Sequence, residues 1–191
     1  MTALYRNDRP GQHAPSWYAD SLPPDTERPP LRGDVTADVA ILGAGFTGLW
    51  AALTLARAGR HVVVLDAHRV GFGASGRNGG QGNLGFNPSQ QKLEAQLGEA
   101  RARALWDLAE EARRQLRDFC ATHAPEARYR PGAAFAEYSP RAMAELEAEA
   151  AFLDQRYGFP LEVLGRDAFA ALVKSPLYAG GLMDPGGGDR H

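Results

Sequence analysis

The feature of this sequence that most constrains its fold is a glycine-rich turn between two apolar runs, within residues 38–66. Residues 39–42 form a short apolar run, which is typical of a strand buried on both faces. A helix is expected to begin near Thr47, and residues 61–65 form the second apolar run. The turn contains three glycines in the spacing G-x-G-x-x-G, namely Gly43, Gly45 and Gly48. This order predicts a strand, a tight turn, a helix and a second, parallel strand.

A turn of this kind is suited to the phosphates of a dinucleotide. Its glycines allow a tight turn, a close approach of backbone to a pyrophosphate, and close packing of the helix on the strand. The hexapeptide alone is weak support in a chain with 22 glycines, but Ala52, Gly59 at the expected helix end and Asp66 strengthen it. Asp66 follows the third glycine at close to the ~20 residues at which a carboxylate meets a ribose hydroxyl. The alternative is a structural glycine turn in an α/β domain that binds no phosphate.

A second glycine-rich segment, residues 69–82, follows the second predicted strand directly. Its polar side chains are Ser75, Arg77, Asn78 and Gln81. Polar groups among glycines let backbone N–H groups and side-chain donors gather around an anion or a flat polar ring. Arg77 would offer a forked donor to phosphate, or a positive charge near a reduced flavin. The segment is therefore predicted to contact the ligand, and a solvated loop is the alternative.

Composition excludes several other classes of function. The 21 basic and 23 acidic residues nearly balance, so charge gives no argument for nucleic acid or an anionic membrane. Cys120 is the only cysteine and the histidines lack metal-ligand spacing, so neither a disulfide within the chain nor a metal site is predicted. Residues 39–56 carry no charge, yet their glycines fit a strand, turn and helix better than a membrane span. Residues 1–9 lack the apolar stretch of a signal peptide, so the cytoplasm is the expected compartment.

The remaining segments are predicted from prolines and periodicity. Residues 1–34 form a proline-rich arm, which the aromatic residues Trp17 and Tyr18 are expected to anchor. Two amphipathic helices broken near Gly98 are expected between residues 89 and 119. Their apolar stripe is Leu93, Leu97, Ala104, Leu108, Ala112, Leu116 and Phe119. Trp106 and Cys120 are interpreted as buried, and the acidic and arginine side chains of residues 110–118 as a solvated face of ion pairs.

Beyond residue 128 the pattern predicts a strand at 129–138, then a helix that Ser139 caps and Gly158 ends. A short strand at 161–164 and a short helix at 167–173 follow.

These segments together resemble the FAD-dependent D-amino-acid oxidase/glycine oxidase superfamily, and most closely its γ-glutamylputrescine oxidoreductase-like branch. The most specific part is the block of residues 71–81, directly after the second strand, together with the extended glycine fingerprint that ends at Asp66. Residues 129–132 and 184–188 also look like family segments. The resemblance implies an α/β fold: a Rossmann-like FAD-binding βαβ unit with the start of an α+β substrate domain.

The resemblance also implies a cofactor and a reaction. The residues that would bind FAD are Gly43, Ala44, Gly45, Phe46, Thr47, Gly48, Asp66, Ala67, Ser75, Gly76, Arg77, Asn78, Gly79, Gly80 and Gln81. Such enzymes oxidise a C–N bond of an amine or amino acid by hydride transfer to flavin and pass the electrons to oxygen or another acceptor. The sequence nominates no catalytic acid or base in residues 1–191. Family members are much longer, so the resemblance implies a truncated chain.

The expected organisation is a proline-rich arm (1–34), a FAD-binding unit with its glycine-rich flavin loop (35–88), helices and strands of the FAD and substrate domains (89–180), and the start of an interrupted return to the FAD domain (181–191). Two other functions remain open. One is an NAD-dependent dehydrogenase built on the same βαβ unit. The other is a non-catalytic nucleotide-binding module.

Overall fold

The computed structural model describes residues 9, 11–22, 26 and 28–189. The expectations that concern prolines 10, 23 and 24, residues 1–8 and residues 190–191 lie outside this described part. The chain divides into two compact units, Met1–Gly79 and Gly80–His191. The division falls inside the second glycine-rich segment, earlier than the boundary expected after residue 88, and the functions assigned to the domains stay predictions.

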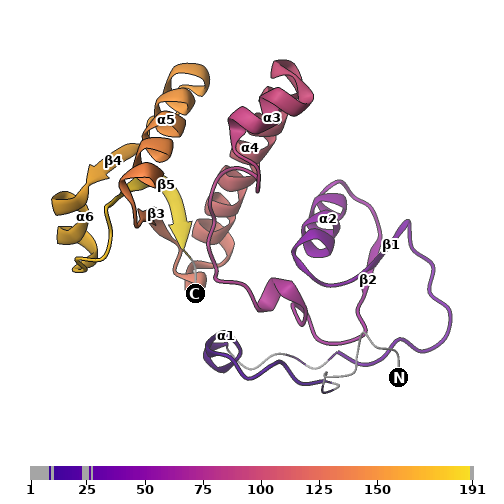
Figure 1. The fold of residues 1–191 in the computed structure, drawn as a ribbon. Helices are drawn as coiled ribbons and strands as arrows, with labels where there is room; N and C mark the ends of the chain where they lie inside the picture. Colours follow the sequence, from indigo (N-terminus) through magenta and orange to yellow (C-terminus); the bar gives the residue numbers. More distant parts are fainter. Residues whose placement is uncertain (1–8, 10, 23–25, 27, 190–191) are drawn as a thin grey trace. The chain divides into compact units, whose positions relative to one another are not determined.

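The first unit contains the predicted βαβ arrangement. Its elements are α1 (Trp17–Ser21), β1 (Val39–Leu42), α2 (Phe46–Arg57), β2 (Val62–Leu65) and the 3-10 turn η2 (Ala74–Gly76). β1 and β2 pair in parallel, with Val39 opposite Val62 and Leu42 opposite Leu65. Helix α2 contacts both strands, as Figure 1 shows. At the end of α2, Gly59 has a φ of 78° and donates to the carbonyl of Ala56, so the predicted glycine at the helix end is confirmed.

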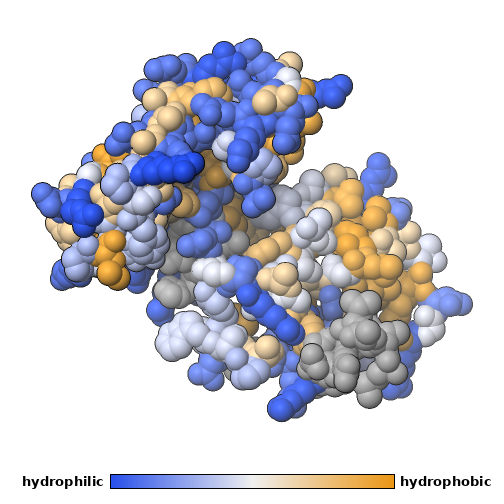
Figure 2. Space-filling model, in the orientation of Figure 1, coloured by the Kyte–Doolittle hydropathy of each residue, from blue (hydrophilic) through white to orange (hydrophobic). Residues whose placement is uncertain are grey.

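Apolar side chains remain exposed on this unit because two strands and one helix cannot cover each other. Leu42 at the end of β1 is 83% exposed, and Phe46 and Leu49 of α2 are also exposed. Figure 2 shows hydrophobic residues gathered over the region of β1, β2 and α2. A parallel sheet is ordinarily covered on both faces. Among the described residues, every helix is too short or too polar to cross a membrane.

The N-terminal arm contains one short helix, α1. The Ser16 side chain accepts a hydrogen bond from the N–H of Ala19 and so caps this helix. Trp17 is 70% exposed. The expectation of an aromatic anchor is therefore wrong for Trp17, whereas Tyr18 is half-buried.

The second unit is α+β. Its elements are α3 (Gln90–Leu97), α4 (Glu99–His123), the 3-10 turn η3 (Pro125–Ala127), β3 (Arg130–Glu137), α5 (Pro140–Tyr157), β4 (Glu162–Gly165), α6 (Arg166–Val173) and β5 (Gly180–Asp189). The strands form an antiparallel sheet in the order β3-β5-β4. The expected break between α3 and α4 occurs at Gly98, which has a φ of 83°, and the Ser139 cap of α5 is also present. Residues 180–189 thus form the central strand, and the expected return to the FAD domain stays a prediction.

The face of α4 that is buried in the core of this unit differs from the predicted apolar stripe. Ala102, Trp106 and Cys120 are buried, whereas Leu108 is 62% exposed. The prediction that Trp106 and Cys120 are buried is confirmed. The assignment of Leu108 to the buried stripe is wrong. The ring of Trp106 lies 5.3 Å from the ring of Phe159, edge to face. Phe169 of α6 is fully buried against β5.

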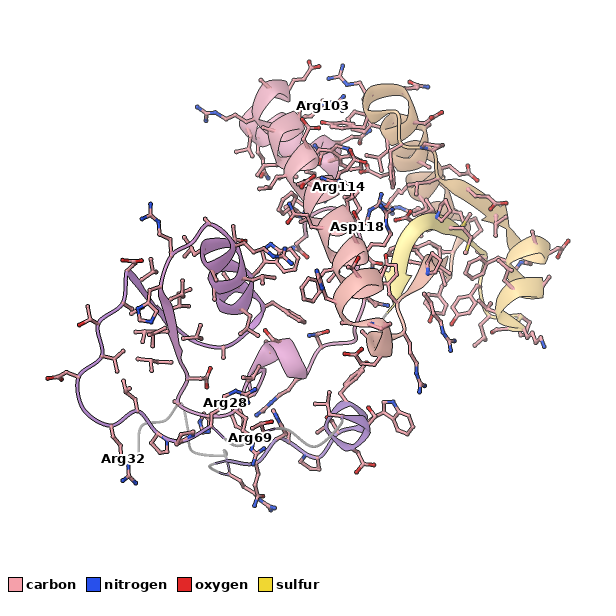
Figure 3. The ribbon with its side chains drawn as sticks, turned by 180° about the vertical axis from the view of Figure 1, so that it is seen from behind. Arg28, Arg32, Arg69, Arg103, Arg114 and Asp118 are labelled. Atoms are coloured by element: carbon pink, nitrogen blue, oxygen red, sulfur yellow. The ribbon has the colours of Figure 1, made fainter. Side chains whose placement is uncertain are left out.

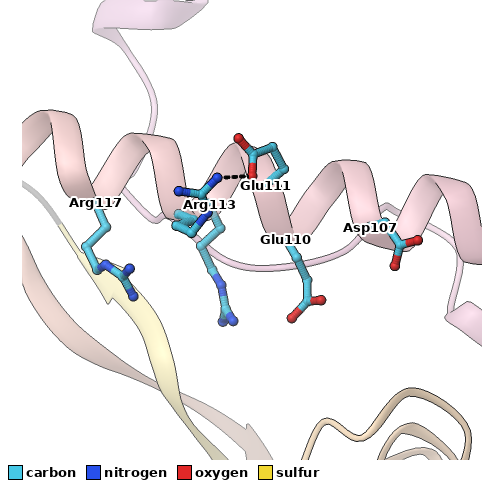
Figure 4. Close-up of a pocket in the computed structure, with 6 residues that line it drawn as sticks. Asp107, Glu110, Glu111, Arg113 and Arg117 are labelled. Atoms are coloured by element: carbon cyan, nitrogen blue, oxygen red, sulfur yellow. Dashed lines mark hydrogen bonds and ion pairs between the residues drawn. The ribbon is translucent and has the colours of Figure 1, made fainter.

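The charged side of α4 is only partly the solvated face that the sequence predicts. Arg114 pairs with Glu111 and, at 3.8 Å, with Asp118 one turn away (Figure 3). A hollow of about 400 Å³ on this helix is lined by equal numbers of acidic and basic side chains (Figure 4): Asp107, Glu110, Glu111, Arg113, Arg114 and Arg117. The side chain of Arg113 is only 16% exposed and pairs with Asp184 of β5. The prediction of a solvated pair is therefore wrong for Arg113.

Candidate dinucleotide-binding site

The glycine turn between β1 and α2 brings the helix very close to the strand. A Cβ atom on Gly48 would lie 2.0 Å from the carbonyl oxygen of Gly43 and 3.2 Å from Cγ2 of Ile41. Gly43 has a φ of 105° and donates to the carbonyl of Leu65 over 2.7 Å. This geometry is the close approach of helix and strand that the G-x-G-x-x-G spacing predicts.

Asp66 lies beside this turn. Its Oδ2 accepts a hydrogen bond from the N–H of Ala44 over 2.7 Å, and its Oδ1 accepts one from the N–H of His68 over 2.8 Å. Asp66 itself is exposed. A carboxylate has about four acceptor sites, so one that accepts two backbone N–H groups can still accept hydrogen bonds from a ligand hydroxyl. The structure therefore places the predicted ribose-binding carboxylate at the turn.

Ser75 of the second glycine-rich segment also lies at the turn. Its Oγ accepts a hydrogen bond from the N–H of Phe46 over 2.9 Å. Gly45 occupies the N-cap position of α2, and a Cβ atom there would lie 2.9 Å from this Oγ. The first N–H groups of a helix lack partners within the helix and attract anions. The Ser75 hydroxyl thus stands where a phosphate oxygen is expected.

The second segment has a defined conformation of its own. The N–H of Gly71 donates to the carbonyl of Ala44, and a Cβ atom on Gly76 would lie 2.2 Å from the carbonyl oxygen of Gly71. The side-chain amide of Asn78 donates to the carbonyls of Ala74 and Ser75. The first of these contacts connects the segment to the first glycine turn, and the others fix its conformation from within.

Arg77 lies on an aromatic ring in the same segment. Its Nε donates to the carbonyl of Phe72 over 2.8 Å, and its guanidinium carbon lies 4.6 Å from the centre of the Phe72 ring. Phe72 is 9% exposed and stacks on His68 with 4.0 Å between ring centres. The sequence did not indicate that Phe72 positions Arg77. A single large aromatic residue among glycines, directly after a strand, is the signal that could have indicated it.

The structure brings together only part of the predicted site. Residues 43–48, 66–67 and 75–79 all belong to the first unit, where Asp66 and Ser75 contact the turn directly. Thr47, Ala67 and Gly79 are exposed there. Gly80 and Gln81 belong to the second unit, so their predicted role in the site remains a prediction. In the described part of the chain, histidine, cysteine and acidic side chains do not gather into a group that could hold a metal ion.

Comparison with protein families agrees with this geometry. Residues 38–191 match the model of the family described as FAD dependent oxidoreductase. The chain belongs to this family. The family that the sequence predicts is therefore confirmed.

Two curated relatives are similar over nearly the whole chain. A probable oxidoreductase OrdL from Rhizobium meliloti (strain 1021) is 37% identical over 177 residues, which are 92% of this chain and 41% of that protein. Gamma-glutamylputrescine oxidoreductase from Escherichia coli (strain K12) is 36% identical over 180 residues, 94% of this chain and 42% of that protein. The chain spans about two fifths of the length of these curated relatives.

Solved structures show the same fold at lower identity. A shortened L-amino acid deaminase from Proteus vulgaris matches with a TM-score of 0.66 at 17% identity. The match covers 94% of this chain and 44% of the deaminase chain. Glycine oxidase from Bacillus cereus matches with a TM-score of 0.64 at 20% identity. This match covers 81% of this chain and 40% of the glycine oxidase chain. The predicted α/β fold is therefore confirmed.

The residues at the turn fit the dinucleotide that the family name implies. Gly45, at the N-cap of α2, lacks a Cβ atom and so leaves room for a pyrophosphate at the start of the helix, and Gly48 lets α2 pack closely on the strand. Asp66 supplies an exposed carboxylate beside it. Both halves of the FAD recognition pattern, phosphate and ribose, thus have partners of suitable chemistry.

Proposed function

We propose that the first unit binds FAD and that Asp66 carries the recognition. The supporting observation is the 2.7 Å hydrogen bond between the Asp66 carboxylate and the N–H of Ala44, which holds an acidic side chain against the glycine turn of a FAD-family chain. The proposed contacts in this unit are Gly43, Ala44, Gly45, Phe46, Thr47, Gly48, Asp66, Ala67, Ser75, Gly76, Arg77, Asn78 and Gly79. Gly80 and Gln81 belong to the second unit, and their contact with FAD stays a prediction from the sequence.

Each part of this set has its own task in the proposal. The N–H groups at the start of α2 and its positive dipole end bind the pyrophosphate. Ser75 releases the N–H of Phe46 to a phosphate oxygen and donates its own hydroxyl hydrogen to the ligand. Asp66 accepts hydrogen bonds from the ribose hydroxyls and repels a 2′-phosphate. Arg77, fixed on Phe72, places a positive charge near the flavin or its phosphates.

We further propose that the whole enzyme oxidises the C–N bond of an amine or amino acid. Bound at the residues proposed above, FAD would supply the acceptor for the hydride that leaves the carbon bearing the nitrogen. Support comes from the 36% identity with an enzyme named gamma-glutamylputrescine oxidoreductase. In this division of labour, the present chain holds and orients the cofactor, and the electron acceptor is oxygen or another oxidant. None of its residues is assigned as a catalytic acid or base.

Ligand-dependent unfolding tests the cofactor. FAD and NAD are added separately to the 191-residue chain, and the thermal midpoint is followed against ligand concentration. Only a ligand that binds the folded state raises the midpoint. FAD is expected to raise it and NAD to leave it unchanged. The variant Asp66→Ala should lose most of the FAD effect, and an equal response of this variant would contradict the role of Asp66.

A chimaera tests the reaction separately from cofactor binding. This chain replaces the matching two fifths of the Escherichia coli relative, so that the remainder of the enzyme is supplied. Anaerobic addition of γ-glutamylputrescine, a D-amino acid or glycine should bleach the flavin absorbance with at least one of these substrates. If the chimaera binds flavin but none of these substrates bleaches the flavin absorbance, the proposed reaction is contradicted. The alternative of a non-catalytic nucleotide-binding module would then be favoured.

A further inference from the structure

The end of β5 is rich in glycine, and glycine-rich strands specify their pairing weakly. Residues 184–189 are Asp, Pro, Gly, Gly, Gly and Asp. From Gly180 to Asp184, β5 keeps one register with β3, in which Asp184 lies opposite Ala133. Beyond this point the register changes, and Gly188 lies opposite Pro131.

The change of register is a bulge on β5. Between the two paired regions, β3 has one residue, Gly132, and β5 has three, residues 185–187. A continuous register would instead place Gly186 opposite Pro131 and Gly187 opposite Arg130. The two registers differ by two residues, and the side-chain period of a strand is also two, so every side chain keeps its face in both. Burial of one face therefore cannot choose between them.

A buried ion pair holds the bulge. The side chain of Asp184 is 5% exposed, and its Oδ2 lies 3.1 Å from Nη1 of Arg113 on α4. Its Oδ1 accepts a hydrogen bond from the N–H of Gly186 over 2.9 Å. The guanidinium lies so close to the bulge that a Cβ atom on Gly186 would meet Nη1 at 2.9 Å. Figure 4 shows Arg113 extending from α4 on the same side as Glu110 and Arg117.

We propose that the Arg113–Asp184 ion pair is a register lock, which selects the bulged register of β5 against the continuous one. A side-chain oxygen that accepts the N–H two residues later requires a local turn of the backbone, and an extended strand does not contain one. Arg113 holds the carboxylate in the position from which it makes this turn. Specifying register is the best-attested role of buried polar and ionic groups.

The lock has a consequence for the chain that follows. The bulge contains two extra residues of β5. At ~3.3 Å per residue, they shift the point at which β5 leaves the sheet by about 7 Å along the strand. A chain in the continuous register would start its next segment from a different position.

Cysteine pairs report the register directly. In a Cys120→Ala background of the 191-residue chain, Arg130→Cys is combined with Asp189→Cys for the bulged register or with Gly187→Cys for the continuous one. Oxidation is followed by mass spectrometry, and the ratio of the two cross-linking rates is measured. With the ion pair present, the first pair should react on the order of tenfold faster, because coupled buried groups contribute differences of this size.

The lock is removed with Arg113→Met/Asp184→Leu, which leaves neither charge buried without a partner. The ratio should then fall to within about twofold, since no side-chain packing favours either register. The pair Ala134→Cys/Met183→Cys, which is opposite in both registers, controls for folding.

An unchanged ratio in a double variant that still forms the control cross-link would overturn the proposal. If that variant loses the control cross-link, Arg113→Gln/Asp184→Asn replaces it with the same expected fall in the ratio. Arg113→Lys keeps the charge and should keep the preference. Faster reaction of the Gly187→Cys pair in the chain with an intact ion pair would overturn the bulged register itself.

Discussion

Substitution of Gly48 by alanine is the most direct test of the site, because the structure sets the size of the effect. The added Cβ would lie 2.0 Å from the carbonyl oxygen of Gly43, which belongs to closely packed backbone. Helix α2 must therefore move away from β1 by more than 1 Å for ordinary contact, as this separation is roughly 3.3 Å for such atoms. Overpacking of this kind costs about 1–3 kcal/mol and occasionally more.

Alanine recovers part of this cost, because it is better than glycine within a helix by about 1 kcal/mol. The overpacking cost is expected at the upper end of this range, about 3 kcal/mol, because a backbone carbonyl cannot rotate away as a side chain can, and the expected net loss in the free energy of unfolding is then roughly 2 kcal/mol. For a unit of this size the midpoint should fall by roughly 10 °C. FAD affinity should fall on the order of tenfold or more, because the shift displaces the N–H groups that bind the pyrophosphate.

Gly73→Ala is the matched control. Gly73 lies in the same unit with a φ of −77°, and a Cβ atom there would have no neighbour within 4 Å. Its effect should stay within about 1 kcal/mol and can be stabilising. Thermal unfolding and FAD titration of both variants are compared. Equal stability of the two variants would refute the close packing of α2 on the turn.

Three further results are expected. Ser75→Ala removes the acceptor for the N–H of Phe46, so stability should fall by about 1 kcal/mol, as for a lost helix cap, and FAD affinity should fall as well. Asp66→Asn keeps an acceptor for the glycine turn, so its loss of stability in a thermal melt should be smaller than that of Asp66→Ala. Burial and a hydrogen bond to Glu94 raise the pKa of Tyr157. The stability that this tyrosine contributes is therefore present below about pH 10 and is lost as the pH rises through its folded pKa, and Tyr157→Phe should remove that part of the alkaline loss.

Local patterns were sufficient to predict most of the elements. The strand, turn and helix at residues 39–57 follow from a short-range rule on glycine spacing, and the start of α5 at Pro140 follows from the preceding Ser139 as its N-cap. The break at Gly98 is also local, since its φ of 83° is open mainly to glycine. Such features depend on a few neighbouring residues, and their physical cause can be read directly from the chain.

The inward face of α4 could not be predicted in this way. This helix is rich in alanine, so a stripe through Ala104 and Leu108 and a stripe through Ala102 and Trp106 both have helical spacing. Only tertiary packing decides between them, and the structure buries the second. A large aromatic residue on one of two competing stripes is the better guide, because it has more apolar area to bury.

Long-range partners explain the remaining differences. Arg113 has acidic neighbours along its own helix, so the sequence favours a solvated ion pair. Its partner in the structure is Asp184, on a strand far along the chain, and no local rule connects the two. In the same way, the contact between Ser75 and Phe46 joins two glycine-rich segments whose proximity follows only from the parallel pairing of β1 and β2.

Both units use a carboxylate to fix a segment that glycine leaves free. Asp66 accepts the N–H of Ala44 within the first glycine turn, and Asp184 accepts the N–H of Gly186 in the bulge of β5. Glycine gives the backbone access to tight turns at the cost of conformational entropy, and a charged acceptor restores a single conformation because hydrogen bonds to charged groups are stronger than neutral ones. The two carboxylates differ in exposure, however. Asp66 is exposed and can still bind a ligand, whereas Asp184 is buried and its charge is paired with that of Arg113.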